Sequence, residues 1–246
     1  MKHLILSALA LIPLLATTAF AQDPVSATKE PPPWTGEAEA GAILVTGNSD
    51  SESYAAKLKT VYTHEKNIFT LAGSYIRAEA NGTESARNWY GSLRYDRELA
   101  EMFSVFIAQR VESDIFAGYL QRDATDVGVK YFLIKKDDLN WIVEAGYRYQ
   151  KTQPTIGTPF YDNLGRLYSE VNKQWDKTLS FKYWLEYLPN FSDANGYFIN
   201  SEASMNVMLN SIFSLKIGYL LQYQNAPPAD GKNTTTTTTM NLVAKF

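Results

Sequence analysis

The sequence predicts an all-β protein, a transmembrane antiparallel up-and-down β-barrel of about twelve strands that follows a cleaved signal peptide. Three observations lead to this fold class. The chain starts with a secretory signal, it alternates apolar and polar residues with a period of two from Trp34 onward, and the last alternating segment ends on an aromatic residue.

The first 21 residues have the parts of a secretory signal. Lys2 and His3 form a short basic start, residues 4–15 are mainly apolar, and Ala19-Phe20-Ala21 is a cleavage pattern. A membrane-spanning helix needs about 20 apolar residues, so this run is too short to be an anchor. We expect cleavage after Ala21, a flexible proline-rich periplasmic leader over 22–33, and a single barrel domain over 34–246.

Composition favours a membrane barrel over other classes. The chain has 16 Tyr, 12 Phe and 5 Trp, no Cys, and a net charge of -3. This small charge argues against a nucleic-acid partner. No segment after the signal is long and apolar enough for a transmembrane helix.

The alternation divides the domain into about twelve strands. Five of the connections between them are short, and most of the others are longer and rich in Pro, Gly and Asn, as in barrels with short periplasmic turns and long outer loops. Residues 47–50 are the exception, a tight hairpin on the outer side. The predicted strands are 35–46, 52–63, 68–79, 85–97, 103–113, 122–133, 140–151, 162–173, 178–188, 196–208, 212–223 and 234–246.

The aromatic residues indicate which face meets lipid. They lie near both ends of many strands, for example Tyr54 with Tyr62 and Trp141 with Tyr149. A separation of 6 to 8 residues, at ~3.3 Å per residue and a tilt near 40°, places such pairs roughly 15–20 Å apart along the membrane normal. This approximates two aromatic girdles around an apolar band. The competing interpretation is a soluble β-sandwich.

The end of the chain predicts barrel closure and assembly. Met240, Leu242, Ala244 and Phe246 point the same way, so we expect them to form a membrane-facing row. A barrel must pair its last strand with its first to leave no edge in lipid. Such a terminal aromatic pattern is similar to the signal that outer-membrane proteins present to the barrel assembly machinery. The expected surroundings are outer-membrane lipid and lipopolysaccharide.

Several short segments resemble one bacterial family. They are Trp34-Thr35-Gly36-Glu37-Ala38-Glu39-Ala40-Gly41, Val45-Thr46-Gly47-Asn48-Ser49-Asp50-Ser51, Tyr90-x4-Tyr95-Asp96 and Phe116-Ala117-Gly118-Tyr119. The chain resembles the salt-induced outer-membrane protein family of Gram-negative bacteria from Trp34 to Phe246. This resemblance implies an outer-membrane barrel of unknown function, and it transfers no catalytic residues.

Residues suited to catalysis are scarce. After the signal, His64 is the only histidine, and it lies in a predicted periplasmic turn. Outer-membrane hydrolases need a His paired with Ser or Asp near the outer rim, and a zinc site needs several His or Cys ligands. We therefore expect no enzyme activity, no metal site and no cofactor.

The lumen-facing row is the strongest candidate site. It carries equal numbers of bases and acids, which predicts either a narrow pore with charged rings, linked to envelope or osmotic stress, or a closed barrel braced by ion pairs. About twelve strands leave both open, because eight-stranded barrels are filled and sixteen-stranded barrels conduct. The candidates are Glu37, Glu39, Lys57, Lys59, Arg94, Asp96, Arg110, Glu112, Asp126, Lys130, Glu144, Arg148, Arg166, Glu170, Lys182, Glu186, Glu202 and Lys216.

A third function uses the outer loops. Tyr119, Phe160, Tyr161 and Phe191 are aromatic residues next to polar residues in predicted outer segments, where exposed rings would bind a surface partner. The oligomeric state has no sequence signal.

Overall fold

The computed structural model describes residues 32–45, 51–193, 196–227 and 232–246. The predicted signal peptide, almost all of the predicted leader and the predicted hairpin at 47–50 lie outside these residues.

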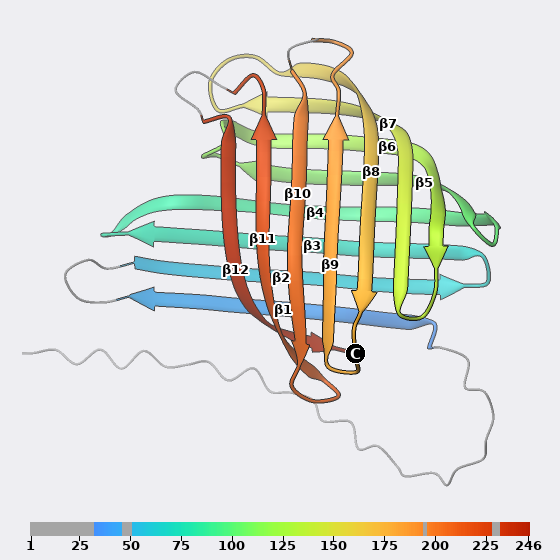
Figure 1. Ribbon diagram of the computed structural model, residues 1–246. Coiled ribbons are helices and arrows are strands. Elements are labelled where there is room, and N and C mark those ends of the chain that lie inside the picture. The colour runs from blue at the N-terminus through green and yellow to red at the C-terminus, as the bar shows by residue number, and fades with distance from the viewer. Residues whose placement is uncertain (1–31, 46–50, 194–195, 228–231) are drawn as a thin grey trace, which may run out of the picture. The chain divides into compact units, whose positions relative to one another are not determined.

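Twelve antiparallel strands form one closed barrel, in which each strand pairs with its sequence neighbours and β1 also pairs with β12 (Figure 1). The predicted fold class is therefore confirmed. The strands are β1 (Trp34–Val45), β2 (Ser51–His64), β3 (Asn67–Ala80), β4 (Thr83–Ala100), β5 (Phe103–Asp114), β6 (Tyr119–Lys135), β7 (Leu139–Pro154), β8 (Phe160–Gln174), β9 (Leu179–Leu188), β10 (Phe198–Met208), β11 (Phe213–Gln224) and β12 (Thr234–Lys245).

Several strands are longer than their alternation predicts. The strand predicted at 122–133, for example, is β6 and runs from Tyr119 to Lys135. Backbone pairing with β5 and β7 continues where the apolar alternation has stopped, with register shifts near Tyr119 and Phe132. The pattern of side chains marks the membrane-facing part of a strand, whereas the hydrogen-bond ladder extends into the rims.

The turns at one end of the barrel are short. Glu65 has a φ of 53° and lies in the tight turn between β2 and β3. In the turn between β8 and β9, the Asp176 carboxylate accepts hydrogen bonds from the Thr178 hydroxyl and from the backbone N–H groups of Thr178 and Leu179. These bonds, that of the hydroxyl most of all, hold the pKa of Asp176 below its usual value. We call this rim the short-turn end and the opposite rim the long-loop end.

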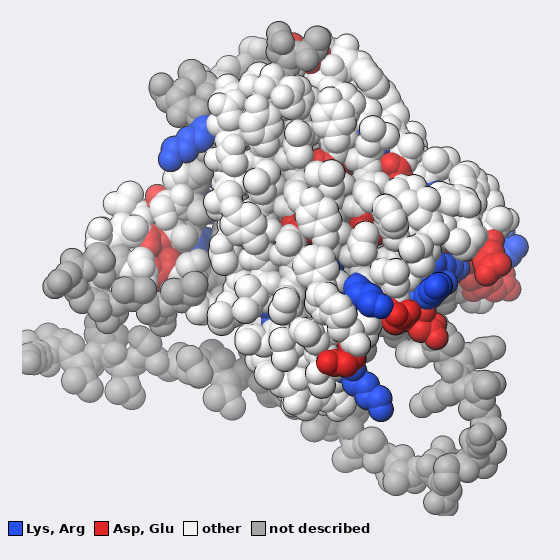
Figure 2. Space-filling view, in the orientation of Figure 1, with Lys and Arg blue, Asp and Glu red and all other residues white. Residues whose placement is uncertain are grey.

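Burial is inverted relative to a soluble protein. The most deeply buried side chains include Asp96, Glu144 and Asn241, whereas Leu93, Leu167 and Met240 are more than half exposed. Figure 2 shows the wall over β8 to β12 covered mainly by uncharged side chains, with larger groups of charged side chains at the lower rim. In the described ranges, no helix is long and apolar enough to cross a bilayer. An apolar outer wall around a polar interior matches a protein whose outer solvent is lipid.

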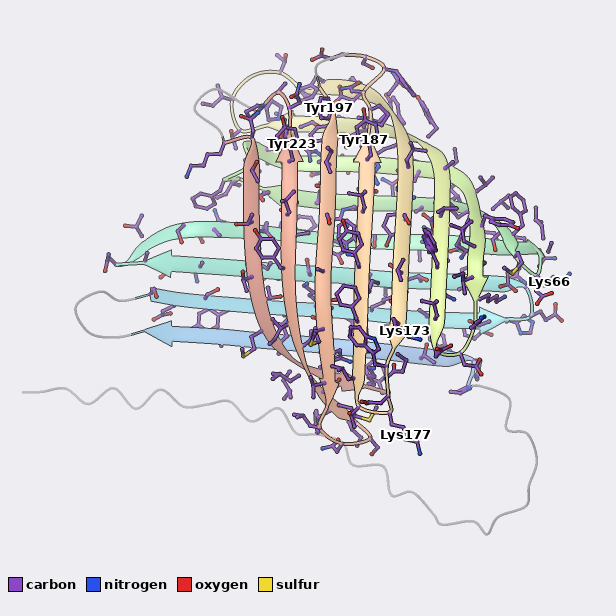
Figure 3. The ribbon with its side chains drawn as sticks, viewed as in Figure 1. Lys66, Lys173, Lys177, Tyr187, Tyr197 and Tyr223 are labelled. Atoms are coloured by element: carbon purple, nitrogen blue, oxygen red, sulfur yellow. The ribbon has the colours of Figure 1, made fainter. Side chains whose placement is uncertain are left out.

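Aromatic rings form a girdle at each end. At the short-turn end, the Tyr62 ring centroid lies 4.6 Å from that of Trp34 and 6.4 Å from that of Phe69. At the long-loop end, Tyr197 lies 6.0 Å from Tyr187 and 5.9 Å from Tyr223, centroid to centroid (Figure 3). Amphipathic rings prefer the two interfaces of a bilayer, so these girdles mark the edges of the apolar band.

The seam between β1 and β12 closes the barrel over a short distance. The backbone N–H of Gly36 donates to the Phe246 carbonyl at 2.7 Å, and the N–H of Phe246 donates to the Gly36 carbonyl at 3.0 Å. The register continues to the pair Ala40 and Leu242 and ends there. By contrast, β1 pairs with β2 along its whole length.

The Gly36→Ala variant tests this closure. A Cβ at Gly36 would lie 2.4 Å from Cε2 of the Phe246 ring, so the ring must move away from the seam. We expect a loss of stability of about 1–3 kcal/mol, as for other overpacked sites, measured as a lower unfolding temperature on heat-modifiable gels. Gly91→Ala is the matched control, because a Cβ there meets no atom within 4 Å. Equal unfolding temperatures for the two variants would contradict the role of the ring.

Candidate functional site

The charged lumen residues lie on one continuous inner face. In antiparallel sheets, directly opposite residues share a face. Glu39 on β1 is opposite Lys57 on β2, Lys57 is opposite Ser74 on β3, and Ser74 is opposite Tyr90 on β4. Buried Glu39 places this face inside the barrel.

A central charge network fills one side of the lumen, and we define it as Arg94, Asp96, Asp126, Lys130, Glu144, Arg148, Arg166 and Glu186. Glu144 is its hub: its carboxylate accepts hydrogen bonds from Arg94 at 2.6 Å and from Arg166 at 2.5 Å. Four bases and four acids alternate along the network, so its formal charge cancels.

The remaining members extend the network in two directions. Toward one side, the Lys130 Nζ donates to Asp96 at 2.7 Å. Toward the other, Arg148 donates through Nε to Asp126 at 2.6 Å and lies 3.3 Å from the Glu186 carboxylate. Buried charges require such partners, because an unpaired ion in a low-dielectric interior is strongly destabilising.

Some of these contacts reach across the lumen rather than along the wall. Arg94 on β4 contacts Glu144 on β7, so β5 and β6 lie between their strands. The ring of Phe106 on β5 lies 4.0 Å below the Arg94 guanidinium and 5.5 Å from that of Arg166 on β8. The network is therefore a brace inside the barrel.

A second cluster lies nearer the long-loop end. Glu112 accepts from Arg110 at 2.5 Å and lies 3.4 Å from Arg122. The Arg122 guanidinium stacks 3.9 Å from the Tyr119 ring and lies 5.6 Å from the ring of Phe198 on β10. The contact between β6 and β10 crosses the lumen.

The short-turn end holds two smaller clusters. Lys216 donates to Glu39 at 2.6 Å and lies 4.0 Å from Glu202. Asn241 also donates to Glu39, at 2.8 Å. Lys182 pairs with Glu170 at 2.8 Å. Near them lies a cavity of about 260 Å³, whose lining includes Glu37, Lys182 and Lys216 together with residues of the short turns.

The two sides of the lumen differ. Glu37, Lys57 and Lys59 are the only predicted lumen residues without a salt bridge to another described residue, and all three lie on β1 and β2. No residue of β2 or β3 is fully buried, although every residue of both strands is described. The opposite residues on β3 are small, with Ser74 facing Lys57 and Ala72 facing Lys59. The wall of β1 to β3 is thus free of the brace that fills the side of β4 to β9.

The sequence-derived list missed Arg122, a lumen residue of the second cluster. Its parity matches that of Asp126 and Lys130, which were included, so the signal was present. The alternation is weak at the start of β6, and this residue falls at the predicted strand boundary. Its contact with Phe198 depends on the closed three-dimensional barrel and has no signal in the sequence.

The aromatic residues that were expected to be exposed at the outer rim differ in their actual exposure. Tyr119 is only 8% exposed, contrary to the expectation of an exposed loop ring, because it begins β6 and stacks on Arg122 inside the barrel. Phe160 and Tyr161 are exposed but belong to β8, and Tyr161 stacks on Tyr149 at 5.9 Å. Phe191 is 70% exposed.

The described residues show no cluster suited to binding a metal ion. They contain no group of three or more His, Cys, Asp or Glu side chains placed to hold a metal ion. His64 ends β2 at the short-turn end, where its ring lies 6.4 Å from that of Tyr62.

Comparison with known proteins places this chain in a family. The family model described as "Protein of unknown function, DUF481" matches residues 38–246. The chain belongs to this family. The family description assigns no inducer and no activity. A relative, the uncharacterized protein YdiY of Escherichia coli (strain K12), is 24% identical over 221 residues, which cover 89% of this chain and 85% of YdiY.

A solved porin shares the fold. The NanC porin is 12% identical and aligns with a TM-score of 0.54, covering 85% of this chain and 98% of NanC. The KdgM porin aligns with a TM-score of 0.46 at 12% identity, covering 86% of this chain and 98% of KdgM. At 12% identity, the likeness to NanC shows a porin-like barrel fold.

The Glu144→Gln variant tests the brace. It leaves the half-buried Arg94 and the buried Arg166 without their shared, buried anion, so we expect a loss of about 3–5 kcal/mol, as for other broken buried pairs. Unfolding by denaturant in detergent micelles measures it. Glu84→Gln is the control, because its partners Arg77 and Arg87 are about half exposed and such surface pairs contribute about 0–1 kcal/mol. Equal losses in the two variants would refute a structural role for the network.

Proposed function

We propose that the protein is an integral outer-membrane barrel that forms a narrow, water-filled pore for ions and small polar solutes. The observation that supports this function most directly is the asymmetry of the lumen. The side of β4 to β9 is filled by paired charges. By contrast, β2 carries the unpaired Lys57 and Lys59, β3 places the small Ser74 and Ala72 opposite them, and neither strand has a fully buried residue.

The outer membrane is the proposed location because of the outer wall. Exposed apolar side chains and two aromatic girdles require a bilayer, and strands cross a bilayer only as a closed barrel. The porin-like fold supports the same placement. In this orientation the short turns face the periplasm and the long loops face outward.

The proposed path follows the wall of β1 to β3. Lys57 and Lys59 lie two residues apart on this wall and point to the same face. Lys59 is close enough to Glu37, Glu170, Lys182 and Lys216 to interact electrostatically. Two bases without a bonded anion raise the local anion concentration, so the pore is proposed to prefer anions.

The brace has a mechanical part in this function. A barrel held by ion pairs on one side keeps a fixed cross-section, and a pore can select by charge only when its lining residues stay in place. No catalytic step is proposed. A link to osmotic or envelope stress is a further part of the proposal, and it rests on the resemblance to salt-induced proteins.

A closed, charge-braced barrel is the second candidate. The observation that favours it is the contact between Arg122 and Phe198, which spans from β6 to β10 across the outer half of the lumen. If this contact and its neighbours close the path, the protein stiffens the membrane or binds partners without transport.

Conductance in a planar bilayer separates the two functions. We expect small steps with an anion preference, and we expect Lys57→Gln with Lys59→Gln to shift the reversal potential toward cations, because the two unpaired bases are lost. Arg77→Gln is the matched control, since Arg77 pairs with Glu84 and is half exposed outside the lumen row. Silence at every salt concentration and voltage would refute the pore.

Removing the cross-lumen ring tests where the path is narrowest. We expect Phe198→Ala to raise the single-channel conductance about twofold or more, because it removes the ring that faces Arg122 across the lumen. Phe181→Ala, which removes a ring of the short-turn girdle that lies 5.8 Å from Trp175, serves as the control. An unchanged conductance in Phe198→Ala would show that this contact does not limit the pore.

A further inference from the structure

The outer part of the β1–β12 seam is unpaired. Pairing ends at Ala40 and Leu242, although β12 still lies close to Gly41, since a Cβ there would lie 2.7 Å from the Met240 carbonyl oxygen. Beyond it, β1 continues to Val45 and β12 begins at Thr234, without pairing to each other in the described residues. Figure 1 shows the two strands diverging from their common lower part, β1 toward the left and β12 toward the top.

The unpaired edge of β12 lies within the apolar band, and that of β1 begins at the outer edge of the band. Ala42 is opposite Tyr54 on β2, and Thr238 is opposite Tyr219 on β11, so the unpaired edges are level with outward-facing aromatic residues. Free backbone N–H and C=O groups are costly in lipid and need polar partners. The threonines at 234–239 supply hydroxyl groups along this edge. Thr239 shares the lumen face of buried Asn241, which links the edge to the wet interior.

An apolar groove lies directly beside the gap. It has a volume of about 460 Å³ and is lined by four alanines, Gly41 and the rings of Tyr54 and Tyr75. This volume falls in the range of about 300–1,000 Å³ found for small-molecule sites. The groove faces the lipid side, because Tyr54 and Tyr75 belong to the exposed outer wall.

We propose that the unpaired outer part of the seam is a lateral opening that admits one alkyl chain of an amphiphile from the bilayer. The chain lies in the alanine groove, and its polar head meets the free backbone groups and the threonine hydroxyls of β12. The pairing of an apolar groove with an uncompensated polar edge is what selects an amphiphile over a purely polar or purely apolar molecule. This inference goes beyond ion conduction, and its tests require no conductance.

Cross-linking tests the geometry of the opening. The native chain has no Cys, so any disulfide within the chain forms between the two engineered cysteines. Ala38→Cys with Ala244→Cys replaces an outward-facing pair within the paired seam. Ala42→Cys with Met240→Cys replaces the next outward-facing residues that would pair if the same register continued past Ala40 and Leu242. We expect the first pair to form a disulfide at least tenfold faster than the second, because disulfides need Cα atoms within about 7 Å.

Quenching tests the occupant. A bimane label at Thr239→Cys, in full-length protein in vesicles of brominated-chain phosphatidylcholine, reports contact with an acyl chain. We expect at least half of the quenching seen for a label at the outward-facing Met205→Cys. A label at Ala72→Cys, on the same lumen face but on fully paired β3, is expected to stay unquenched.

Three outcomes would overturn the proposal. Equal disulfide rates for the two pairs would show a seam closed along its length. Cross-links between separate copies through Ala42→Cys would show that a second chain covers the edge. Quenching at Thr239→Cys no greater than at Ala72→Cys would show that no acyl chain reaches the unpaired edge of β12. Heat-modifiable migration of each variant confirms that it has folded before it is measured.

Discussion

Closure of the sheet on itself is the constraint on which the structure depends. In lipid, an unpaired backbone N–H or C=O group is costly, so a sheet that does not close on itself is not viable. Here the closure consists of Gly36 to Ala40 paired with Leu242 to Phe246. Gly36 is needed at this place, because the Phe246 ring occupies the space of a Cβ. Phe246 thus fixes the position of β1 through its backbone bonds and its ring. The alternating apolar residues of the outer wall end at this seam.

The same closure determines the chemistry of the interior. Side chains alternate along a strand with a period of two, so half of them point into the barrel. In a barrel that lies in lipid, the apolar side chains are those that point outward. The inward half is therefore polar, and its charges are stable only in pairs or in contact with water. Both ways of stabilising the inward charges, pairing and contact with water, occur here on different walls of the barrel. Glu144 and its arginines illustrate the first, and Lys57 with Lys59 illustrates the second. A brace and a pore are then two sides of one lumen.

The sequence predicted the architecture well because the barrel repeats one local rule. Strand number, outward rows and the inward parity of Glu39 and Arg94 follow from alternation alone. The pairing of charges did not follow. Lys57 faces Glu39 in register yet Glu39 bonds Lys216, two strands away on the other side of β1, because side-chain reach and barrel curvature decide the partner. Tyr119 was misplaced for a similar reason, since stacking on Arg122 draws it inside. The end of the seam at Ala40 has no signal in the alternation, which continues past it.

Accessibility of the lumen wall to water is the most direct test of the account. Single cysteines at Ala55, Ala72 and Ser74 lie on the proposed path, and a cysteine at Ala124 lies on the braced wall, where that residue is 4% exposed. With protein in bilayers, a charged, membrane-impermeant methanethiosulfonate reagent measures their reaction rates. We predict fast modification at the first three positions and at least tenfold slower modification at Ala124. Equal protection at all four positions would contradict a wet path along β2 and β3.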